Sequence, residues 1–512
     1  MKENGLWSLI CMMCLIMGLT LAQTSQICPS HDAISPCSCT LKKSGLDIVC
    51  EFTNLTHISD VMSALKGRTN TVIFYLRLRH SSLPKLQPFV FLGLDIRHLT
   101  IHNSSLAKLE ESSLSSIGTG LTQLDLSQNA LLSVPSSALK DLQHLLILNL
   151  NRNKIKAIHK KAFEGLDTLE ILSLYENEIS TIEEEAFTGL HKKLKRLNLG
   201  GNELNKVPTQ ALHNLDMLKK LEIQENRLTV IQEGDFDGLK SLDSLVLAHN
   251  QLREVPARVF SHLTQLNSLE LDGNQITHVD PDAFIGLEAE SNYAKAGLDY
   301  WIDYCGIMSH LNMEIHSENL QYLRLGDNNL HAVPSDALRR LHRLRHLDLR
   351  SNNITLLPED AFTGYGDSIT FLNLQKNLIK MLPPLVFENL NSLETLNLQN
   401  NKLTQIPEEV TENIVDTLRH IDITDNPLIC DCELRWYSVW LGNLRDKDDE
   451  RMSRKRTVCT MMNEHREYSV QNIPLERMGC VGKNAGRTSS TGNCHVYVDT
   501  MLQLLTTAIA ML

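Results

Sequence analysis

Apolar and polar residues alternate in short bursts along most of the chain, and each burst ends on an asparagine. The recurring phrase is leucine-x-x-leucine-x-leucine-x-x-asparagine, and all but one of the steps between successive asparagines are 24 or 25 residues. A fixed period of this length predicts a solenoid, because one unit is too small to bury its own apolar face and must stack on its neighbours. The asparagines are Asn129, Asn153, Asn177, Asn202, Asn226, Asn250, Asn274, Asn328, Asn352, Asn377, Asn401 and Asn426.

The unit that begins at Leu145 illustrates the expected structure. Its first half alternates like a short strand, so Leu148 and Leu150 are predicted to point inward with Leu145. Ile147 and Asn149 then point to the opposite face of the strand. The second half returns along the outer side and is predicted to pack through Ile158, Phe163 and Leu166.

The asparagine that closes each phrase lies where the chain leaves the strand. An inward amide there can bond backbone groups of adjacent turns that would otherwise be unpaired, so these asparagines are expected to form a ladder. Two earlier units, 72–81 and 96–104, keep the apolar pattern but have serine at this position. With them, residues 71–425 comprise about 14 units. We predict an α/β fold, a curved right-handed horseshoe with a parallel sheet on its concave side.

Eight cysteines flank the repeats in two clusters of four, and none of the eight lies inside a repeat. The end of a solenoid exposes an apolar face, so residues 23–70 and 426–481 are predicted to be caps that disulfides stabilise. Zinc binding is the alternative, but the C-x-C spacing and the predicted secretion argue against it. The clusters are Cys28, Cys37, Cys39, Cys50 and Cys430, Cys432, Cys459, Cys480.

The N-terminus predicts secretion. An apolar stretch over 6–21 follows Lys2, which indicates a signal peptide over residues 1–22 that is cleaved near Ala22 and Gln23. A signal anchor is the alternative, although the stretch is short for a membrane span. The mature chain is therefore expected to be extracellular, either secreted or attached to the outer face of the plasma membrane.

Residues 482–512 are predicted to be a linker followed by an apolar tail. The segment 501–512 has no charged residue and is too short to span a bilayer. Together with small residues upstream, it fits a lipid-anchor signal with Ser489 or Asn484 as the attachment residue. A disordered secreted tail is the alternative.

The repeats and both cysteine clusters resemble the extracellular leucine-rich repeat family in its typical 24-residue class. Residues 28–50 resemble the N-terminal flanking cap of that family, and the segment 426–441 with its two following cysteines resembles the C-terminal flanking cap. The resemblance implies that each cluster pairs its first cysteine with its third and its second with its fourth. The implied bonds are Cys28–Cys39, Cys37–Cys50, Cys430–Cys459 and Cys432–Cys480.

Members of this family mostly bind proteins, in cell adhesion, axon guidance or innate immune recognition. The resemblance therefore implies a non-enzymatic scaffold for cell-surface adhesion or recognition, of the arthropod type that chaoptin and connectin represent. One alternative is a non-catalytic accessory subunit of a secreted enzyme complex, because residues 34–39 resemble the corresponding stretch of a shrimp luciferase subunit. A soluble innate immune receptor is the other alternative.

Residues on the concave face are the candidates for binding. Polar and acidic side chains dominate the positions predicted to face that side, which suits a polar or basic protein partner. Binding at an edge or a cap is the alternative. The candidates are Asp125, Asn149, Tyr175, Asn198, Glu222, Glu270, Asp272, Arg324, Asp348 and Arg350.

Charge and motifs narrow the classes of function. A net charge of -12 and a pI near 5.9 argue against nucleic acid, and a membrane is expected only through the lipid anchor. The expected partner is an extracellular or cell-surface protein, including a second copy of the chain. No G-x-S-x-G, H-E-x-x-H or P-loop motif occurs in the sequence. We expect neither catalysis nor a cofactor or metal.

Two further features bear on the surface. Sequons at Asn54, Asn103 and Asn353 predict glycosylation of a secreted chain. The one long step, from Asn274 to Asn328, becomes regular when residues 289–318 are removed, so these 30 residues are predicted to be an insertion between intact repeats. They are either an aromatic binding loop or a retained intron or gene-model error.

Overall fold

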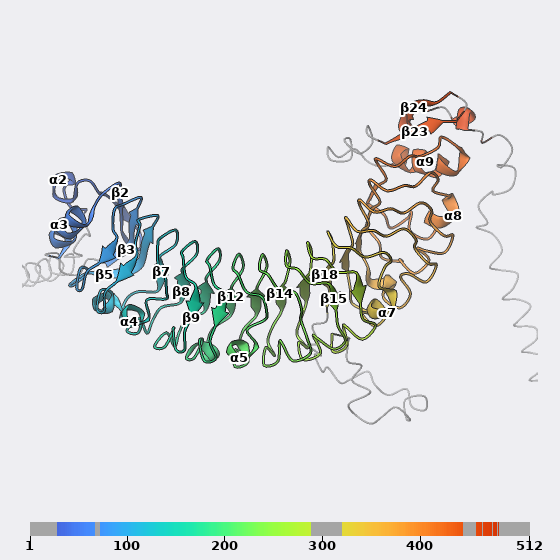
Figure 1. The fold of residues 1–512 in the computed structure, drawn as a ribbon. Helices are drawn as coiled ribbons and strands as arrows, with labels where there is room; N and C mark the ends of the chain where they lie inside the picture. The colour runs from blue at the N-terminus through green and yellow to red at the C-terminus, as the bar shows by residue number, and fades with distance from the viewer. Residues whose placement is uncertain are drawn as a thin grey trace, which may run out of the picture.

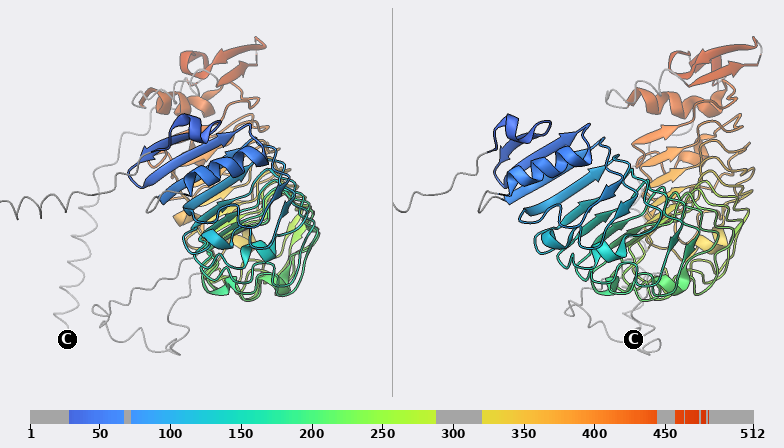
Figure 2. Two further views of the ribbon diagram at one scale, coloured as in Figure 1. Left: turned by 90° about the vertical axis from the view of Figure 1, so that its left-hand side faces the viewer. Right: turned by 60° about the vertical axis from the view of Figure 1, so that its left-hand side comes forward.

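The protein winds into an arc of regular turns between two caps (Figure 1). The computed structural model describes residues 28–66, 72–287, 320–443, 457–462, 464–473, 475–478 and 480. Each turn contributes one strand to the inner side of the arc, and the turned views show these strands side by side in one curved sheet (Figure 2). The predicted parallel-sheet solenoid of about 14 units is confirmed.

The inner sheet has 16 strands. An antiparallel hairpin of β1 (Ser38–Lys42) and β2 (Gly45–Glu51) starts it, and all later pairings are parallel. Leucines of adjacent turns face each other, as Leu148 and Leu172 do. The remaining strands are β3 (Val72–Arg79), β5 (Asp95–His102), β7 (Gln123–Asp125), β8 (Ile147–Asn149), β10 (Ile171–Ser173), β12 (Arg196–Asn198), β13 (Lys220–Glu222), β14 (Ser244–Val246), β16 (Ser268–Glu270), β18 (Tyr322–Arg324), β19 (His346–Asp348), β20 (Phe371–Asn373), β21 (Thr395–Asn397) and β22 (His420–Asp422).

The core lies between this sheet and the outer segments. Leu145, Leu148 and Leu150 are fully buried, as the alternation predicts, and each such side chain contributes roughly 2 kcal/mol on burial. Phe163 stacks on Phe187 of the next turn with ring centroids 5.9 Å apart. The core is therefore a continuous column that every turn extends.

The outer segments differ with their sequence. Four of them form a single helical turn preceded by a proline, whose fixed φ and missing N–H suit the start of a helix. Others pair as two-residue strands or contain a 3-10 turn. The helices are α4 (Ser136–Leu139), α5 (Thr209–Leu212), α7 (Ser335–Leu338) and α8 (Glu408–Thr411); the strands are β4 (Lys85–Leu86), β6 (Lys108–Leu109), β9 (Ala157–Ile158), β11 (Thr181–Ile182), β15 (Glu254–Val255) and β17 (His278–Val279); the 3-10 turns are η1 (Ser115–Ile117), η2 (Leu190–Lys192) and η4 (Gly366–Ser368).

The asparagine ladder is confirmed. In a representative rung, the buried Asn250 amide donates to the Ile223 and Leu247 carbonyls, both at 3.0 Å. Its Oδ1 accepts from the Leu228 N–H at 3.1 Å. Each rung thus satisfies backbone groups of its own turn and of the turn before it.

The sheet continues across the long step in the sequence. β16 pairs directly with β18, with Leu269 opposite Leu323. Asn328 donates to the Leu271 carbonyl at 3.0 Å, which is the same rung geometry as elsewhere. The predicted insertion 289–318 lies outside the described residues.

Both caps contain two disulfides. The structure joins Cys28 to Cys39, Cys37 to Cys50, Cys430 to Cys459 and Cys432 to Cys480. In the C-terminal cap, the Trp436 indole N–H donates to the Ile406 carbonyl of the last repeats at 2.8 Å. The predicted signal peptide and the apolar tail lie outside the described residues. Cap elements are α2 (His31–Ile34), α3 (Leu55–Leu65), η5 (Cys432–Leu434), α9 (Arg435–Asn443), β23 (Val458–Met461), β24 (Arg466–Ser469), η6 (Val470–Asn472) and η7 (Leu475–Met478).

Candidate binding surface

Three columns of side chains cover the concave face. Each three-residue strand presents its first and third residues there, and the residue two positions after the strand adds the third column. In β19, for example, the columns are His346, Asp348 and Arg350. The ten predicted candidates all belong to the second and third columns.

Several of these candidates serve the backbone. Asp125, Asn149 and Asn198 each accept, through Oδ1, a hydrogen bond of 2.9 to 3.0 Å from the N–H two residues later. Asp348 accepts in the same way from the Arg350 N–H at 3.0 Å. The recurrence of Asp and Asn in the second column therefore reflects a local cap of the strand end, which reduces its value as a sign of ligand binding.

Of the strands that lack Asp or Asn in the second column, β10 and β18 obtain the acceptor from the preceding repeat. Where β10 ends in Ser173, the Tyr175 N–H donates to Asn151 Oδ1 at 2.7 Å. Where β18 ends in Arg324, the Gly326 N–H donates to Asp272 Oδ1 at 2.9 Å. A neutral amide performs this task in the first case and a carboxylate in the second.

Gly326 allows the close approach of Asp272. A Cβ at this position would lie 2.8 Å from Asp272 Oδ1 and 3.0 Å from the Arg350 Cγ atom. Any larger residue would therefore displace the carboxylate or the arginine stem. The glycine therefore lets the Asp272 carboxylate and the Arg350 stem lie close against the backbone of β18 and the residues that follow it.

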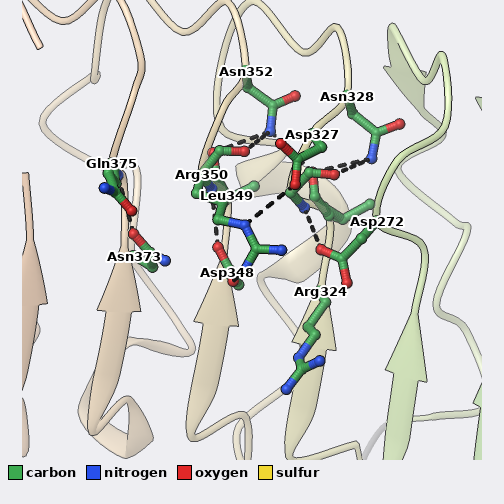
Figure 3. A network of polar contacts seen from close by, with 12 residues as sticks. Asp272, Arg324, Asp327, Asn328, Asp348, Leu349, Arg350, Asn352, Asn373 and Gln375 are labelled. Carbon is green, nitrogen blue, oxygen red and sulfur yellow. Dashed lines mark hydrogen bonds and ion pairs between the residues drawn. The ribbon is translucent and has the colours of Figure 1, made fainter. Parts of the chain in front are cut away.

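The charges around Asp272 are unevenly paired (Figure 3). Arg350 donates from Nη1 to Asp348 Oδ2 at 2.8 Å and from Nε to Asp327 Oδ2 at 3.2 Å. Arg324 extends away from Asp272 and lies 3.5 Å from Glu270. Asp272 is only 5% exposed. Even so, among the described residues, no cationic group forms an ion pair with its carboxylate.

This environment changes the acidity of Asp272. Burial, together with the nearby negative charge of Asp348, raises the pKa of the Asp272 carboxyl to about 6. The charges of Arg350 and Arg324 and the Gly326 N–H act in the opposite direction and do not compensate. At neutral pH the face therefore holds a buried negative charge that its own residues leave incompletely balanced.

Glu222, another candidate, is fully balanced. Arg196 donates to it through Nε at 2.8 Å and Nη2 at 3.0 Å, and Lys220 lies 3.4 Å away. Tyr175 is also engaged, because its hydroxyl donates to Glu225 at 2.9 Å across the repeat that carries Gly200. Burial raises the pKa of Tyr175 to about 12, so the hydroxyl stays protonated.

An aromatic row in the first column was not predicted. Tyr322, His346 and Phe371 stand on adjacent strands, with ring centroids 5.9 Å apart for the first pair and 4.0 Å for the second. His346 and Phe371 are parallel within 3°. Burial lowers the pKa of His346, which favours its neutral form. The sequence carries this signal at the first residue of each strand, a position absent from the candidate set.

A hollow lies near the N-terminal end of the same face. It has a volume of about 200 Å³ and is lined by Tyr75, Arg77, His98, Asp125 and Asn149, among others. The Arg77 guanidinium lies 4.2 Å from the Tyr75 ring centroid and also pairs with Asp47. The Arg77 charge is already paired with Asp47, so this arginine is not left unbalanced for a partner to bind. The Asp272 region is therefore the stronger candidate for binding.

The predicted glycosylation residues lie on the surface of their turns. Asn54 is exposed and caps α3 by accepting from the His57 N–H at 3.1 Å. Asn103 is exposed, with its amide nitrogen 3.0 Å from His80 Nδ1. Asn353 is half-buried. The candidate lipid-anchor residues, Ser489 and Asn484, lie outside the described residues.

The described residues contain neither a cluster suited to a metal ion nor a helix suited to a membrane. Within those ranges, no group of three or more His, Cys, Asp or Glu side chains is placed to hold a metal ion. No helix among the described residues has the length and apolarity needed to cross a membrane.

Similar solved structures share this fold. They include a complex of TLR13 with single-stranded RNA (24% identity, TM-score 0.62, 83% of this chain and 59% of that chain) and a leucine-rich repeat protein of Leptospira interrogans (22%, 0.52, 76% and 91%). The complex of Toll with Spätzle from Drosophila is also similar (18%, 0.52, 87% and 77%). The chain spans less than two thirds of the TLR13 chain. Because a protein of this fold is solved with RNA, the prediction that nucleic acid is excluded is weakened.

The repeats also match a family model. The model described as leucine rich repeat matches residues 119–169, 144–193, 192–252, 241–289, 318–366 and 367–428, which together exceed half of the chain. The asparagine ladder, the stacked leucines and the disulfide-bonded ends agree with that match. This protein is a member of the leucine-rich repeat family.

Proposed function

We propose that this protein is a non-enzymatic extracellular recognition protein that binds a basic segment of a protein partner on its concave face. The observation that carries the proposal is the incompletely balanced carboxylate of Asp272. A buried charge without a full counterion destabilises a fold, and sites of this kind concentrate where a ligand completes them. Asn151 shows that a neutral amide can accept the equivalent backbone hydrogen bond.

The neighbouring side chains suit such a partner. An ammonium or guanidinium group that approaches Asp272 would also lie near the carboxylate of Asp348, and the exposed Tyr322 ring, four residues before Gly326 on the same face, would offer apolar contact to another part of the segment. Aromatic residues next to desolvated charges are frequent energetic centres of protein interfaces. Basic partners are therefore favoured over acidic ones.

Extracellular adhesion or recognition is the role we favour. The disulfides of both caps suit an oxidising compartment, and Toll, a protein of similar fold, is solved in complex with Spätzle. Attachment through Ser489 or Asn484 would place the face outside a cell, and release by a phosphatidylinositol-specific phospholipase would reveal it. A soluble immune receptor or an accessory subunit would instead be found free in the medium.

A binding screen tests the proposal. Multimers of the secreted protein are presented to extracellular and cell-surface proteins of the source organism, with the chain itself included. We expect a partner with a basic contact segment whose binding is lost in Asp272→Arg and kept in the control Glu388→Arg, which reverses an exposed carboxylate outside the three columns. A partner that binds both variants equally would contradict the proposed surface, as would saturable binding of single-stranded RNA without any protein partner.

A further inference from the structure

An apolar strip lies on the surface just after two adjacent rungs of the ladder. Leu356, Leu378 and Met381 are 55%, 39% and 61% exposed. Leu356 and Met381 occupy the same place in their turns, four residues after Asn352 and Asn377 respectively. Single exposed apolar residues are ordinary on protein surfaces, but three of them on two adjacent turns require an explanation.

Other turns rarely place large apolar residues at these positions. Four residues after the ladder asparagine stand Ser133, Ala157, Thr181, Lys206, Val230, Glu254, His278, Ala332 and Gln405. One residue after it, every turn but that of Leu378 has a polar residue, alanine or proline. The strip is therefore a local departure from the repeat, and repeat packing does not require it.

A sequon borders this strip. Asn353 directly follows Asn352, so it occupies in its turn the place that Leu378 occupies in the next one. The two turns are in register there, because the Leu378 N–H donates to the Ile354 carbonyl at 2.9 Å. Neighbouring turns of a sheet are roughly 5 Å apart, so a sugar on Asn353 starts beside Leu378.

The Asn353 amide is also free for modification. Among the described residues, its side chain forms no hydrogen bond, and Thr355 of the sequon is exposed. The other two sequons differ, since Asn54 caps a helix and the Asn103 amide contacts His80. The ladder residue Asn352 is committed to the Leu325 and Leu349 carbonyls.

We propose that an N-linked glycan on Asn353 covers the apolar strip of Leu356, Leu378 and Met381. A glycan is bulky and solubilising, and its inner sugars would shield these side chains from water and from other molecules. Without it, the strip is an exposed patch that favours association between copies of the chain. The glycan also closes this flank to partners and leaves the concave face accessible.

The test removes the glycan in two ways. Asn353→Gln and Thr355→Ala are secreted from a eukaryotic host and compared with the wild type and with Thr56→Ala, which removes a distant sequon and keeps Asn54 as the helix cap. Peptide mass spectrometry measures occupancy, anilinonaphthalene sulfonate fluorescence reports exposed apolar surface, and light scattering after gel filtration gives the oligomeric state. Treating the folded wild type with peptide-N-glycosidase provides the same comparison without altered biosynthesis.

We expect Asn353 to carry a glycan in the wild type. Asn353→Gln and Thr355→Ala should each self-associate and show at least about a twofold rise in dye fluorescence. Thr56→Ala should show neither change. Adding Leu356→Ser, Leu378→Ser and Met381→Ser to Asn353→Gln should restore the monomer and the low fluorescence. An unoccupied Asn353 would overturn the proposal. So would aglycosylated protein with the fluorescence and oligomeric state of the wild type, or self-association that the triple serine change leaves intact.

Discussion

Two places on the concave face solve the same backbone problem with different chemistry. At the end of β10, Asn151 accepts from the Tyr175 N–H, and at the end of β18, Asp272 accepts from the Gly326 N–H. The fold needs one acceptor oxygen at each place, and an amide supplies it as well as a carboxylate does. The charge at Asp272 is therefore an addition that folding does not require, which is why we assign it to binding.

The largest expected effect comes from removing that charge while keeping the acceptor. Asp272→Asn should stabilise the protein by about 3 kcal/mol at pH 7.5, because a pKa of about 6 lies roughly two units above the ordinary value and each unit corresponds to about 1.4 kcal/mol. Urea unfolding of wild type and variant at pH 7.5 measures the difference. A variant less stable than the wild type would show that the charge supports the fold.

The stability difference between the wild type and Asp272→Asn should depend on pH. Since the folded protein holds the Asp272 proton more tightly than the unfolded chain, the wild type loses stability relative to Asp272→Asn as pH rises from about 4 to about 6. Below about pH 4 the carboxyl is protonated in both states and the penalty vanishes. A difference that stays constant between pH 3.5 and pH 7.5 would contradict the raised pKa.

Removing the acceptor itself should act in the other direction. Asp272→Ala leaves the Gly326 N–H without its partner, so this variant should be about 1 to 3 kcal/mol less stable than Asp272→Asn. Asn151→Ala should lose a similar amount relative to the wild type through the Tyr175 N–H. Equal stability of Asp272→Ala and Asp272→Asn in urea titrations would mean that water replaces the acceptor and that the two places are not equivalent.

The aromatic residues of the two regions should separate binding from folding. Tyr322 is 45% exposed, so Tyr322→Ala should weaken partner binding by about 5- to 30-fold and change stability by less than about 0.5 kcal/mol. Tyr175→Ala should instead lower stability by about 1 kcal/mol, because its hydroxyl bonds to Glu225, and leave affinity unchanged. Biolayer interferometry measures the affinity of both variants, and thermal melts measure their stability. Weaker binding in Tyr175→Ala with unchanged binding in Tyr322→Ala would contradict the proposed surface.

The smallest effect is expected at the exposed ion pairs. Arg324 and Glu270 are 3.5 Å apart with partly exposed side chains, as are Arg152 and Glu176 at 2.7 Å in the other region. Arg324→Ala and Arg152→Ala should each change the melting stability by less than about 0.5 kcal/mol. A large loss in Arg324→Ala alone would indicate that this arginine balances Asp272 more fully than its direction away from that carboxylate suggests.

Repetition explains how much of the fold was predictable. The strand, the ladder asparagine and the outer phenylalanine recur at one period, so a single unit such as 145–166 suffices to place all of them. The polar second column was also visible in the sequence, but its role in capping the strand end was not. The hydrogen bonds that Asp125 and Asn149 accept from nearby N–H groups depend on the backbone conformation at the strand end.

The Asp272 region could not be predicted in the same way. Its decisive hydrogen bond joins residues 54 positions apart, and it exists because β18 resumes the sheet directly beside β16. Burial of one carboxylate and pairing of its neighbour Asp348 with Arg350 are properties of three repeats together. The aromatic row could have been predicted from the sequence. Tyr322, His346 and Phe371 occupy the same repeat position, the first residue of the strand.

The most direct test of the account is the affinity of the screened partner for Asp272→Asn. The variant keeps the acceptor for Gly326 and removes the charge, so its affinity at pH 7.5 and physiological salt should fall by about 30-fold or more, a loss of about 2 kcal/mol. Asn151→Asp, which adds a carboxylate in the other region, should change the affinity by less than about threefold, because that end of the face lacks the aromatic row. Unchanged binding of Asp272→Asn would contradict the claim that the charge of Asp272 exists for a partner.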